Sequence, residues 1–342
     1  MRPESDDWRP SCSTQMLHIR AEMLRSIRDF FRDRDYLEVE TPCLSRDIVL
    51  DAWLEPIAID AGGPQWFLQT SPEAHMKRLL AAGADSIFQV SRVFRKHERG
   101  NQHNSEFTMI EWYGVGSTWL EQFEVTESLL RTATAAAARV TGHDVAVRWS
   151  PETFQQTTYA AAFQRAFGVD VFGCSGRQLM DAARHFGVPL PDGLREDRID
   201  DVLNVMLAFA IEPRLGGTSE DGSIRPEFLC DYPPAQAALA VVSETYPPVA
   251  RRFELYVQGL ELCNGYQELT DELELRRRDA VQNQRRIGEK SQELPGASRL
   301  LAAMQSGLPP CSGVALGFDR LVMVATACRD IREVMPFPED RA

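Results

Sequence analysis

The stretch RFELYVQGLELCNGYQEL, residues 252–269, alternates apolar and polar side chains on both sides of Gln258-Gly259. An alternation with period two predicts two β-strands, and a two-residue connection with glycine predicts a tight hairpin between them. With that turn, Tyr256 faces Glu261 across the strands, and Glu254 lies diagonally beside Glu261 on the same face. The stretch therefore predicts an antiparallel hairpin that brings two carboxylates together.

Two carboxylates on a half-buried sheet repel one another, and a divalent cation bound with water or phosphate oxygens would relieve this repulsion. Glu254 and Glu261 are therefore candidate metal ligands. A bulge at Gly265 would turn Asn264 and Glu268 towards the same cavity. The alternatives are a solvated hairpin face with two unrelated glutamates, and a simple turn at Asn264-Gly265.

The rest of the chain predicts an α+β fold with a large, mostly antiparallel sheet flanked by helices, because strands mostly follow strands. Ser71 as N-cap, Pro72 and Glu73 mark the start of one helix, and Thr118 with Glu121 fits a capping box. The expected strands are 36–45, 66–70, 86–94, 106–113, 228–233 and 312–317. The expected helices are 16–35, 71–83, 118–140, 177–186, 198–211, one from about 271, and one that Asp319-Arg320 opens within a strand-to-helix unit at 312–327.

Composition narrows the class of protein. The chain has 342 residues, 44% of them hydrophobic, and a net charge of −13, which argues against a protein that mainly grips a nucleic-acid backbone. Seven cysteines without a CxxC pair indicate neither a disulfide framework nor a zinc site. Residues 1–15 lack an apolar signal segment, and the apolar run 202–211 is too short to span a bilayer. We therefore expect a cytoplasmic protein without membrane association or stable nucleic-acid binding.

Two further stretches carry candidate chemistry. In VFRKHERGNQHNSEF, residues 93–107, Arg95 ends a strand beside a polar loop that offers polyanion-binding groups, and Phe107 offers a ring for a base. In SGVALGFDRL, residues 312–321, glycines flank a short strand and Arg320 emerges near a helix N-terminus, where anions bind. The alternatives are an exposed loop with Phe107 in the core, and an ordinary strand-to-helix turn.

Together these stretches resemble the catalytic domain of class II aminoacyl-tRNA synthetases, in the lysyl branch. The resemblance is carried by ETP (40–42), FR (94–95) with HNSEFTMIEWY (103–113), GVALGFDR (313–320), SPEAHMKRL (71–79) and ELCNGYQELTD (261–271). It covers residues 16–338, which predicts an N-terminal tail, 1–15, and one catalytic domain, 16–342. No anticodon-binding barrel precedes the first motif, as in the elongation factor P lysine ligases, which are truncated lysyl-tRNA synthetase paralogues.

This resemblance implies an enzyme that activates (R)-β-lysine or lysine with ATP and Mg²⁺ as an adenylate, and joins it to a lysine side chain of elongation factor P. It also implies a homodimer built through the ETP segment. Arg95 would hold the α-phosphate and the substrate carboxylate, and Phe107 and Arg320 would sandwich adenine. The other implied ATP contacts are Lys96, His97, His103, Asn104, Glu261, Leu262 and Gly317, with Glu254 and Glu261 on the metal. The implied amino-acid contacts are Ser71, Pro72, Glu73, Tyr113, Asn264, Glu268 and Ala315, with Glu73, Tyr113 and Glu268 on the terminal ammonium.

Three positions depart from the synthetase pattern. Ser71 replaces the usual Ala, and Ala315 replaces a Gly in the third motif, so its methyl group would reshape the amino-acid pocket. His97 replaces an acidic residue, so that either the adjacent Glu98 or the His97 ring would serve adenine recognition, or ATP binding would be weaker. Two alternatives stay open: a minimal tRNA-charging enzyme, and a non-catalytic regulatory paralogue.

Overall fold

The computed structural model describes residues 8–51, 54–60, 62–142 and 147–342. Residues 1–7 of the predicted N-terminal tail lie outside this range. The chain forms two compact units, one of residues 1–147 with 269–342 and one of residues 148–268. The prediction of a single catalytic domain over 16–342 stays a prediction. No helix within the described ranges is both long and apolar enough to cross a bilayer.

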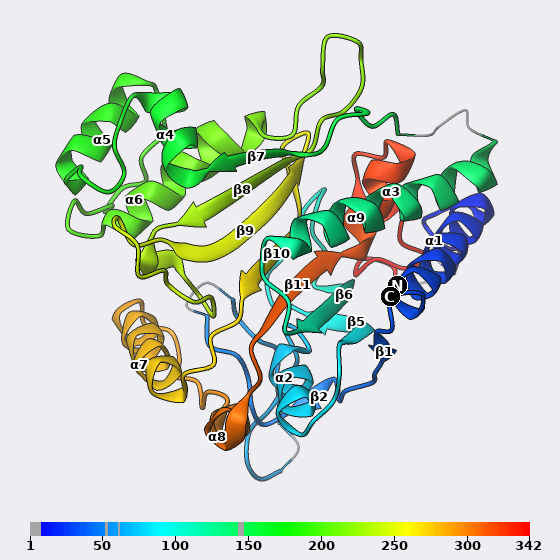
Figure 1. Cartoon of the computed structure of the whole chain (residues 1–342), viewed down its shortest axis with the longest axis horizontal. Helices are drawn as coiled ribbons and strands as arrows, with labels where there is room; N and C mark the ends of the chain where they lie inside the picture. Colours follow the sequence, from blue (N-terminus) through cyan, green and yellow to red (C-terminus); the bar gives the residue numbers. More distant parts are fainter. Residues whose placement is uncertain (1–7, 52–53, 61, 143–146) are drawn as a thin grey trace, which may run out of the picture. The chain divides into compact units, whose positions relative to one another are not determined.

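The first unit holds its main strands in the order β1-β5-β6-β11, with a small antiparallel sheet, β2-β4-β3, beside them (Figure 1). β1 runs parallel to β5, whereas β5, β6 and β11 pair antiparallel. The strands are β1 (Leu37–Glu38), β2 (Leu44–Ser45), β3 (Ala58–Ile59), β4 (Trp66–Leu68), β5 (Ile87–Phe94), β6 (Glu106–Val115) and β11 (Cys311–Gly317). The helices are α1 (Thr14–Arg32), α2 (Glu73–Ala81), α3 (Glu121–Thr141), α7 (Glu272–Gly288), α8 (Ser298–Gly307) and α9 (Phe318–Thr326), with a 3₁₀ turn at Ile331–Glu333.

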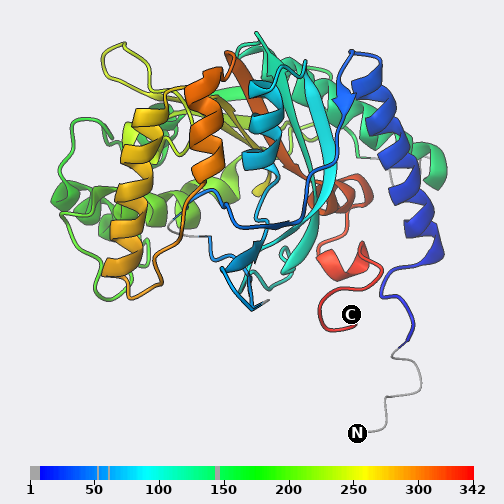
Figure 2. The same ribbon diagram turned by 90° about the horizontal axis from the view of Figure 1, so that it is seen from below.

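Helix α1 covers one face of β5 and β6. Its residue Phe31 stacks on Phe88 with ring centroids 4.7 Å apart and lies 5.3 Å from the Trp112 ring. The Trp112 indole donates a 2.8 Å hydrogen bond to Gln122 of α3, which itself packs along α1. Burying these large rings stabilises the unit, by roughly 1.5–3 kcal/mol for each fully buried side chain. Helix α8 packs against α2 and against α7 (Figure 2).

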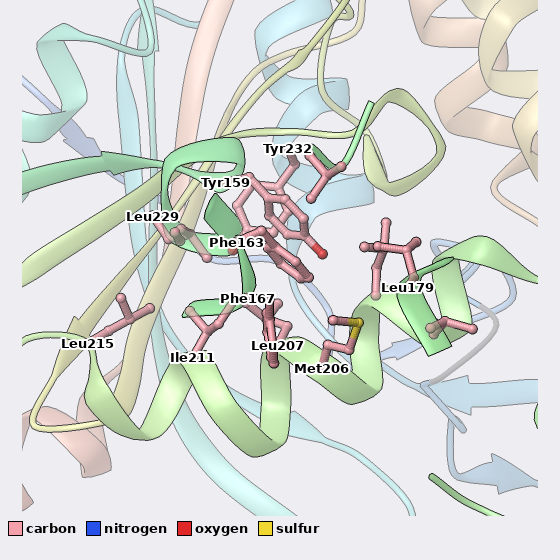
Figure 3. Close-up of a cluster of buried hydrophobic side chains, with 14 of the residues drawn as sticks. Tyr159, Phe163, Phe167, Leu179, Met206, Leu207, Ile211, Leu215, Leu229 and Tyr232 are labelled. Carbon is pink, nitrogen blue, oxygen red and sulfur yellow. The ribbon is translucent and has the colours of Figure 1, made fainter. Parts of the chain in front are cut away.

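The second unit holds strands in the order β10-β9-β8-β7, antiparallel except for the parallel pair β7 and β8. Its strands are β7 (Gln155–Thr158), β8 (Glu227–Tyr232), β9 (Ala250–Val257) and β10 (Leu260–Gln267). Its helices are α4 (Tyr159–Phe167), α5 (Gly176–His185) and α6 (Ile199–Met206), followed by a π-helical turn (Leu207–Ile211) and short 3₁₀ turns at 212–214 and 234–236. These helices enclose an aromatic and aliphatic cluster that includes Tyr159, Phe163 and Tyr232 (Figure 3).

The predicted α+β class with mostly antiparallel strands is confirmed, and most predicted elements are present. Three predictions were wrong in detail. The strand expected over 36–45 is two separate two-residue strands. Ser71 does not cap α2: the amides of His75 and Met76 donate to the Pro72 carbonyl, so the helix begins one residue later than predicted, with no side-chain cap. Strand β7 and helix α4 were not predicted.

Candidate active site

One face of β6 and β11 carries the candidate residues Phe107, Tyr113 and Ala315. Side chains alternate along a strand, so Phe107, Glu111 and Tyr113 share one face, opposite the face on which Trp112 packs against α1. Ala315 of β11 pairs with Glu111, which adds it to the same face. The predicted nucleotide ring contact, Phe107, and two of the predicted amino-acid contacts, Tyr113 and Ala315, therefore lie along one strip, opposite the face that packs against α1.

At one end of this strip four side chains from α2 and β6 meet. The Lys77 ammonium lies 2.5 Å from the Glu73 carboxylate, one helical turn away, and 5.9 Å from the centroid of the Tyr113 ring. The Tyr113 hydroxyl donates a 2.6 Å hydrogen bond to Glu111. Lys77 is only 2% exposed and Glu111 is 1% exposed. The structure thus places Glu73 and Tyr113 each beside Lys77, Ser71 and Pro72 precede the same helix, and the shared role of these residues in binding the amino acid stays a prediction.

Arg95 lies over the ring of Phe107, with its guanidinium carbon 5.1 Å from the ring centroid. The guanidinium donates to the Thr70 carbonyl and to Glu98, each at 3.4 Å. His97 is exposed and has a φ of +69°, so Glu98 is the residue that turns towards Arg95. Glu98 therefore contacts Arg95, and its role in adenine recognition stays a prediction. Lys96 is exposed, and its backbone amide donates to the Glu55 carbonyl.

Arg320, in the first turn of α9, reaches the same loop. Its guanidinium lies 2.7 Å from Nε2 of His103 and donates to the Gln102 carbonyl at 3.3 Å. Burial lowers the pKa of His103, and the positive charges of Arg320 and Arg95 lower it further. Because the charges of Arg95 and Arg320 both act on the His103 imidazole, the loop that follows Arg95 and the first turn of α9 lie close together there. Such a cluster of cationic side chains suits a polyphosphate.

Asn104 and Gly317 have structural partners of their own. The Asn104 amide donates to the Glu106 carbonyl at 2.7 Å and accepts from the Glu339 amide at 3.0 Å. Asn104 therefore fixes the shape of the loop, and its predicted contact with triphosphate stays a prediction. Gly317 pairs with Met109 and precedes the first residue of α9.

The hairpin of the second unit has the predicted turn but not the predicted bulge. Gln258 and Gly259 both have positive φ, +51° and +76°, as a type I′ turn requires, and Tyr256 pairs with Glu261. The register then shifts between Glu261 and Cys263, so the extra residue is the buried Leu262 and not Gly265. A one-residue shift moves all later side chains to the other face.

The consequence of this bulge is that Asn264 lies directly opposite Glu254, and Tyr266 opposite Arg252. Asn264 thus shares a face with both predicted metal ligands, which a regular register would have prevented. Glu268 follows at the end of β10, is 2% exposed and bridges to Ala240. The predicted reorientation of Asn264 by a bulge is therefore present, with the bulge three residues earlier.

Glu254 is held by a buried network. Its carboxylate accepts 2.6 Å hydrogen bonds from the hydroxyls of Tyr232 and Tyr256 and a 2.5 Å contact from Arg252. Burial opposes ionisation of Glu254, but Arg252 and the two hydroxyls outweigh it and hold the pKa below its usual value. Burial and the negative charge of Glu254 raise the pKa of both tyrosines, which therefore remain hydroxyl donors. Tyr232 and Tyr256 belong to the aromatic cluster, so the core of this unit fixes the carboxylate (Figure 3).

The donor set of the hairpin fits a magnesium ion. Mg²⁺ is usually bound by one or two carboxylates with water and phosphate oxygens. Glu261 is half-buried, and its charge acts on Tyr256, the residue that also contacts Glu254. Glu254 already accepts three hydrogen bonds, so Glu261 is the more accessible ligand.

Comparison with known proteins settles the family. The model of the class II tRNA synthetases of the D, K and N group matches residues 5–341. The chain belongs to the class II tRNA synthetase family. Three similar proteins are the elongation factor P–(R)-β-lysine ligases of Pectobacterium atrosepticum, Klebsiella pneumoniae and Vibrio cholerae. Each is 38% identical to this chain, and the alignment covers 99% of both chains. The resemblance inferred from the motifs is thereby confirmed.

Sequence analysis of this class II synthetase chain missed three residues of the site. Glu111 is two residues before Tyr113, and this period-two spacing placed it on the same face. Lys77 is four residues after Glu73, the spacing of neighbours on one helix face. Glu339, which contacts the second-motif loop, gave no such signal, because it comes from the far end of the chain.

Proposed function

We propose that this protein is an ATP-dependent ligase that activates (R)-β-lysine or lysine as an adenylate and transfers it to a lysine side chain of elongation factor P. The observation that carries the proposal is the full-length similarity to ligases of that name. The family match and the strip from Phe107 to Tyr113, with Arg95 above it, support it.

The first step needs alignment and charge cancellation rather than a base. A carboxylate with a pKa near 4 is already a nucleophile at pH 7, so it attacks the α-phosphorus once the two groups are held in line. Arg95 and Arg320 cancel negative charge on the phosphates and on the entering carboxylate. Phe107 offers the adenine a ring face, with Glu98 beside Arg95 at the same end. The products are an aminoacyl adenylate and pyrophosphate.

Residues of the β9–β10 hairpin and of α2 are proposed to bind the metal ion and the amino acid. Glu261 and Glu254 would hold a magnesium ion, which would supply positive charge to the phosphates. By the resemblance to the lysyl branch, Asn264 would orient the carboxylate end of the amino acid, and Glu73, Tyr113 and Glu268 would receive its terminal ammonium. Ala315 pairs with Glu111 across β11 and β6, and its methyl group would select between the α- and β-amino forms.

The second step forms an amide bond. The acceptor lysine loses a proton to water or to pyrophosphate, its amine attacks the adenylate carbonyl, and AMP leaves with the bonding electrons of the carbon–oxygen bond. A homodimer through the ETP segment, residues 40–42, and a cytoplasmic location remain predictions from the sequence.

The decisive experiment is pyrophosphate exchange without tRNA, with lysine and (R)-β-lysine compared, followed by intact mass analysis of elongation factor P. We expect exchange, a mass gain on elongation factor P, and no gain with Arg95→Ala or Arg320→Ala. The chain contains only three lysines, Lys77, Lys96 and Lys290, so self-acylation is simple to detect in the same spectra. Exchange with neither compound would favour a regulatory paralogue, and transfer to tRNA alone would favour a minimal synthetase.

A further inference from the structure

The C-terminal segment, residues 330–341, forms hydrogen bonds with the loop of residues 96–104 at two positions, Asn101 and Asn104. The Ile331 amide donates to the Asn101 carbonyl at 2.7 Å. The Glu339 amide donates to the side chain of Asn104 at 3.0 Å. The loop follows Arg95 and contains His103, and both residues are proposed to face the phosphates of ATP. Contacts of the C-terminal segment with the loop therefore affect the shape of the nucleotide site.

The strongest of these contacts converge on the carboxylate of Glu339. Arg99 donates to it from Nε at 3.0 Å and also from Nη2, and the Ser105 hydroxyl donates at 2.8 Å. Two nitrogens of one guanidinium on one carboxylate form a fork, which fixes direction as well as distance. Glu339 thus binds Arg99 before the turn of the loop and Ser105 after it.

The same residues border a cavity of about 450 Å³ whose walls include Arg99, His103, Asn104, Arg332 and Glu339. A volume of this size is ordinary for a small-molecule site. Arg320 also contacts this loop, at Gln102 and His103. The loop is therefore held both by α9 and by the C-terminal segment.

We propose that Glu339 is a positioning residue that clasps the 96–104 loop in its ATP-binding shape before ATP arrives. The inference rests on the proposed function for its kinetic consequence. A loop that is ordered in the free enzyme loses less conformational entropy on binding, so the apparent affinity for ATP rises. The competing view is that the Arg99–Glu339 pair is one of many surface ion pairs with no measurable effect, since Arg99 is 73% and Glu339 39% exposed.

The test compares Glu339→Gln with Glu333→Gln, which removes the same charge from an exposed side chain of the same segment. Two quantities are measured: the KM for ATP in pyrophosphate exchange, and amide hydrogen exchange of the 96–104 loop without ATP. For Glu339→Gln we expect a KM for ATP higher by about three- to tenfold, since lost charge-assisted hydrogen bonds and ion pairs act on that scale. We expect unchanged kcat and KM for lysine, together with faster loop exchange. Glu333→Gln should change neither, and Arg99→Gln should reproduce Glu339→Gln, with no further effect in the double variant.

Each other outcome overturns the proposal. Unchanged loop exchange in Glu339→Gln would show that no clasp exists, and faster exchange with an unchanged KM for ATP would show that the clasp does not serve binding. Parallel changes in kcat and in the KM for lysine would indicate a general structural defect. If the wild-type enzyme shows no pyrophosphate exchange, the proposed function fails, whereas the loop measurement still decides whether the clasp exists.

Discussion

Replacing Lys77 by methionine should destabilise the protein in the absence of substrate. It should also increase the stabilisation that bound substrate lysine gives. Lys77 is 2% exposed and its ammonium lies 2.5 Å from the Glu73 carboxylate, whose side chain is 12% exposed. Removing one partner of a buried ion pair typically costs about 3–5 kcal/mol, because the other charge stays desolvated. Since Glu73 keeps slight access to solvent, we expect the lower end, about 3 kcal/mol.

For a folded unit of this size, a loss of about 3 kcal/mol lowers Tm by about 6–12 °C. Thermal denaturation measures this directly, with Lys290→Met as the matched control, since Lys290 is exposed and its change should be nearly silent. The double variant Glu73→Gln/Lys77→Met should recover much of the loss, because it removes both charges and leaves neither unpaired.

The substrate supplies the second readout. A lysine concentration of one hundred times Kd stabilises a folded protein by about 2.7 kcal/mol. The substrate ammonium, proposed to bind Glu73, would take the place of the lost Lys77 ammonium, so lysine should raise the Tm of Lys77→Met by more than that of the wild type. The reasoning is refuted if Lys77→Met melts like the Lys290→Met control, or if the double variant is no more stable than Lys77→Met alone.

Three further predictions concern other parts of the site. Ala315→Gly should change the ratio of (R)-β-lysine to lysine activation by about tenfold or more, the usual effect of one methyl-sized group in a pocket, and an unchanged ratio in pyrophosphate exchange would exclude Ala315 as a selector. Glu254→Gln should lose about 3 kcal/mol of stability because buried Arg252 loses its carboxylate, whereas Glu261→Gln should keep its Tm and need more Mg²⁺ for half-maximal exchange; equal effects in both assays would contradict the assignment. The pKa of His103 lies below its usual 6.5, so stability from its neutral form is complete above pH 6.5 and is lost as pH falls towards the lower folded value; an NMR titration of His103 at or above 6.5 would oppose this.

The sequence was sufficient where one local rule decided the structure. Gln258-Gly259 predicted the hairpin turn, because glycine tolerates positive φ and a two-residue connection needs it at both positions. Arg320 was expected near a helix start, and α9 begins two residues before it.

Sequence reasoning failed where the outcome depended on distant partners. Gly265 appeared to be the natural position for a bulge, but the bulge lies at Leu262, where the whole of β10 has to fit β9. One of the three hydrogen bonds on Glu254 comes from Tyr232, which belongs to a different strand, β8. Glu339 is the extreme example, because its partners Arg99 and Ser105 are more than two hundred residues away.

The choice of cations in the site follows from the chemistry of the proposed reaction. An aminoacyl adenylate acylates amines, so an unprotonated lysine near the activated carbonyl would compete with the acceptor protein. A guanidinium stays protonated and does not attack, yet it neutralises phosphate and carboxylate equally well. In this chain the charges of Arg95, Arg99 and Arg320 lie on guanidinium groups, whereas Lys96 is an exposed lysine and Lys77 is buried and paired with Glu73. Arginine at these positions therefore lets the enzyme hold a reactive lysine derivative while leaving the acceptor's lysine as the amine that reacts.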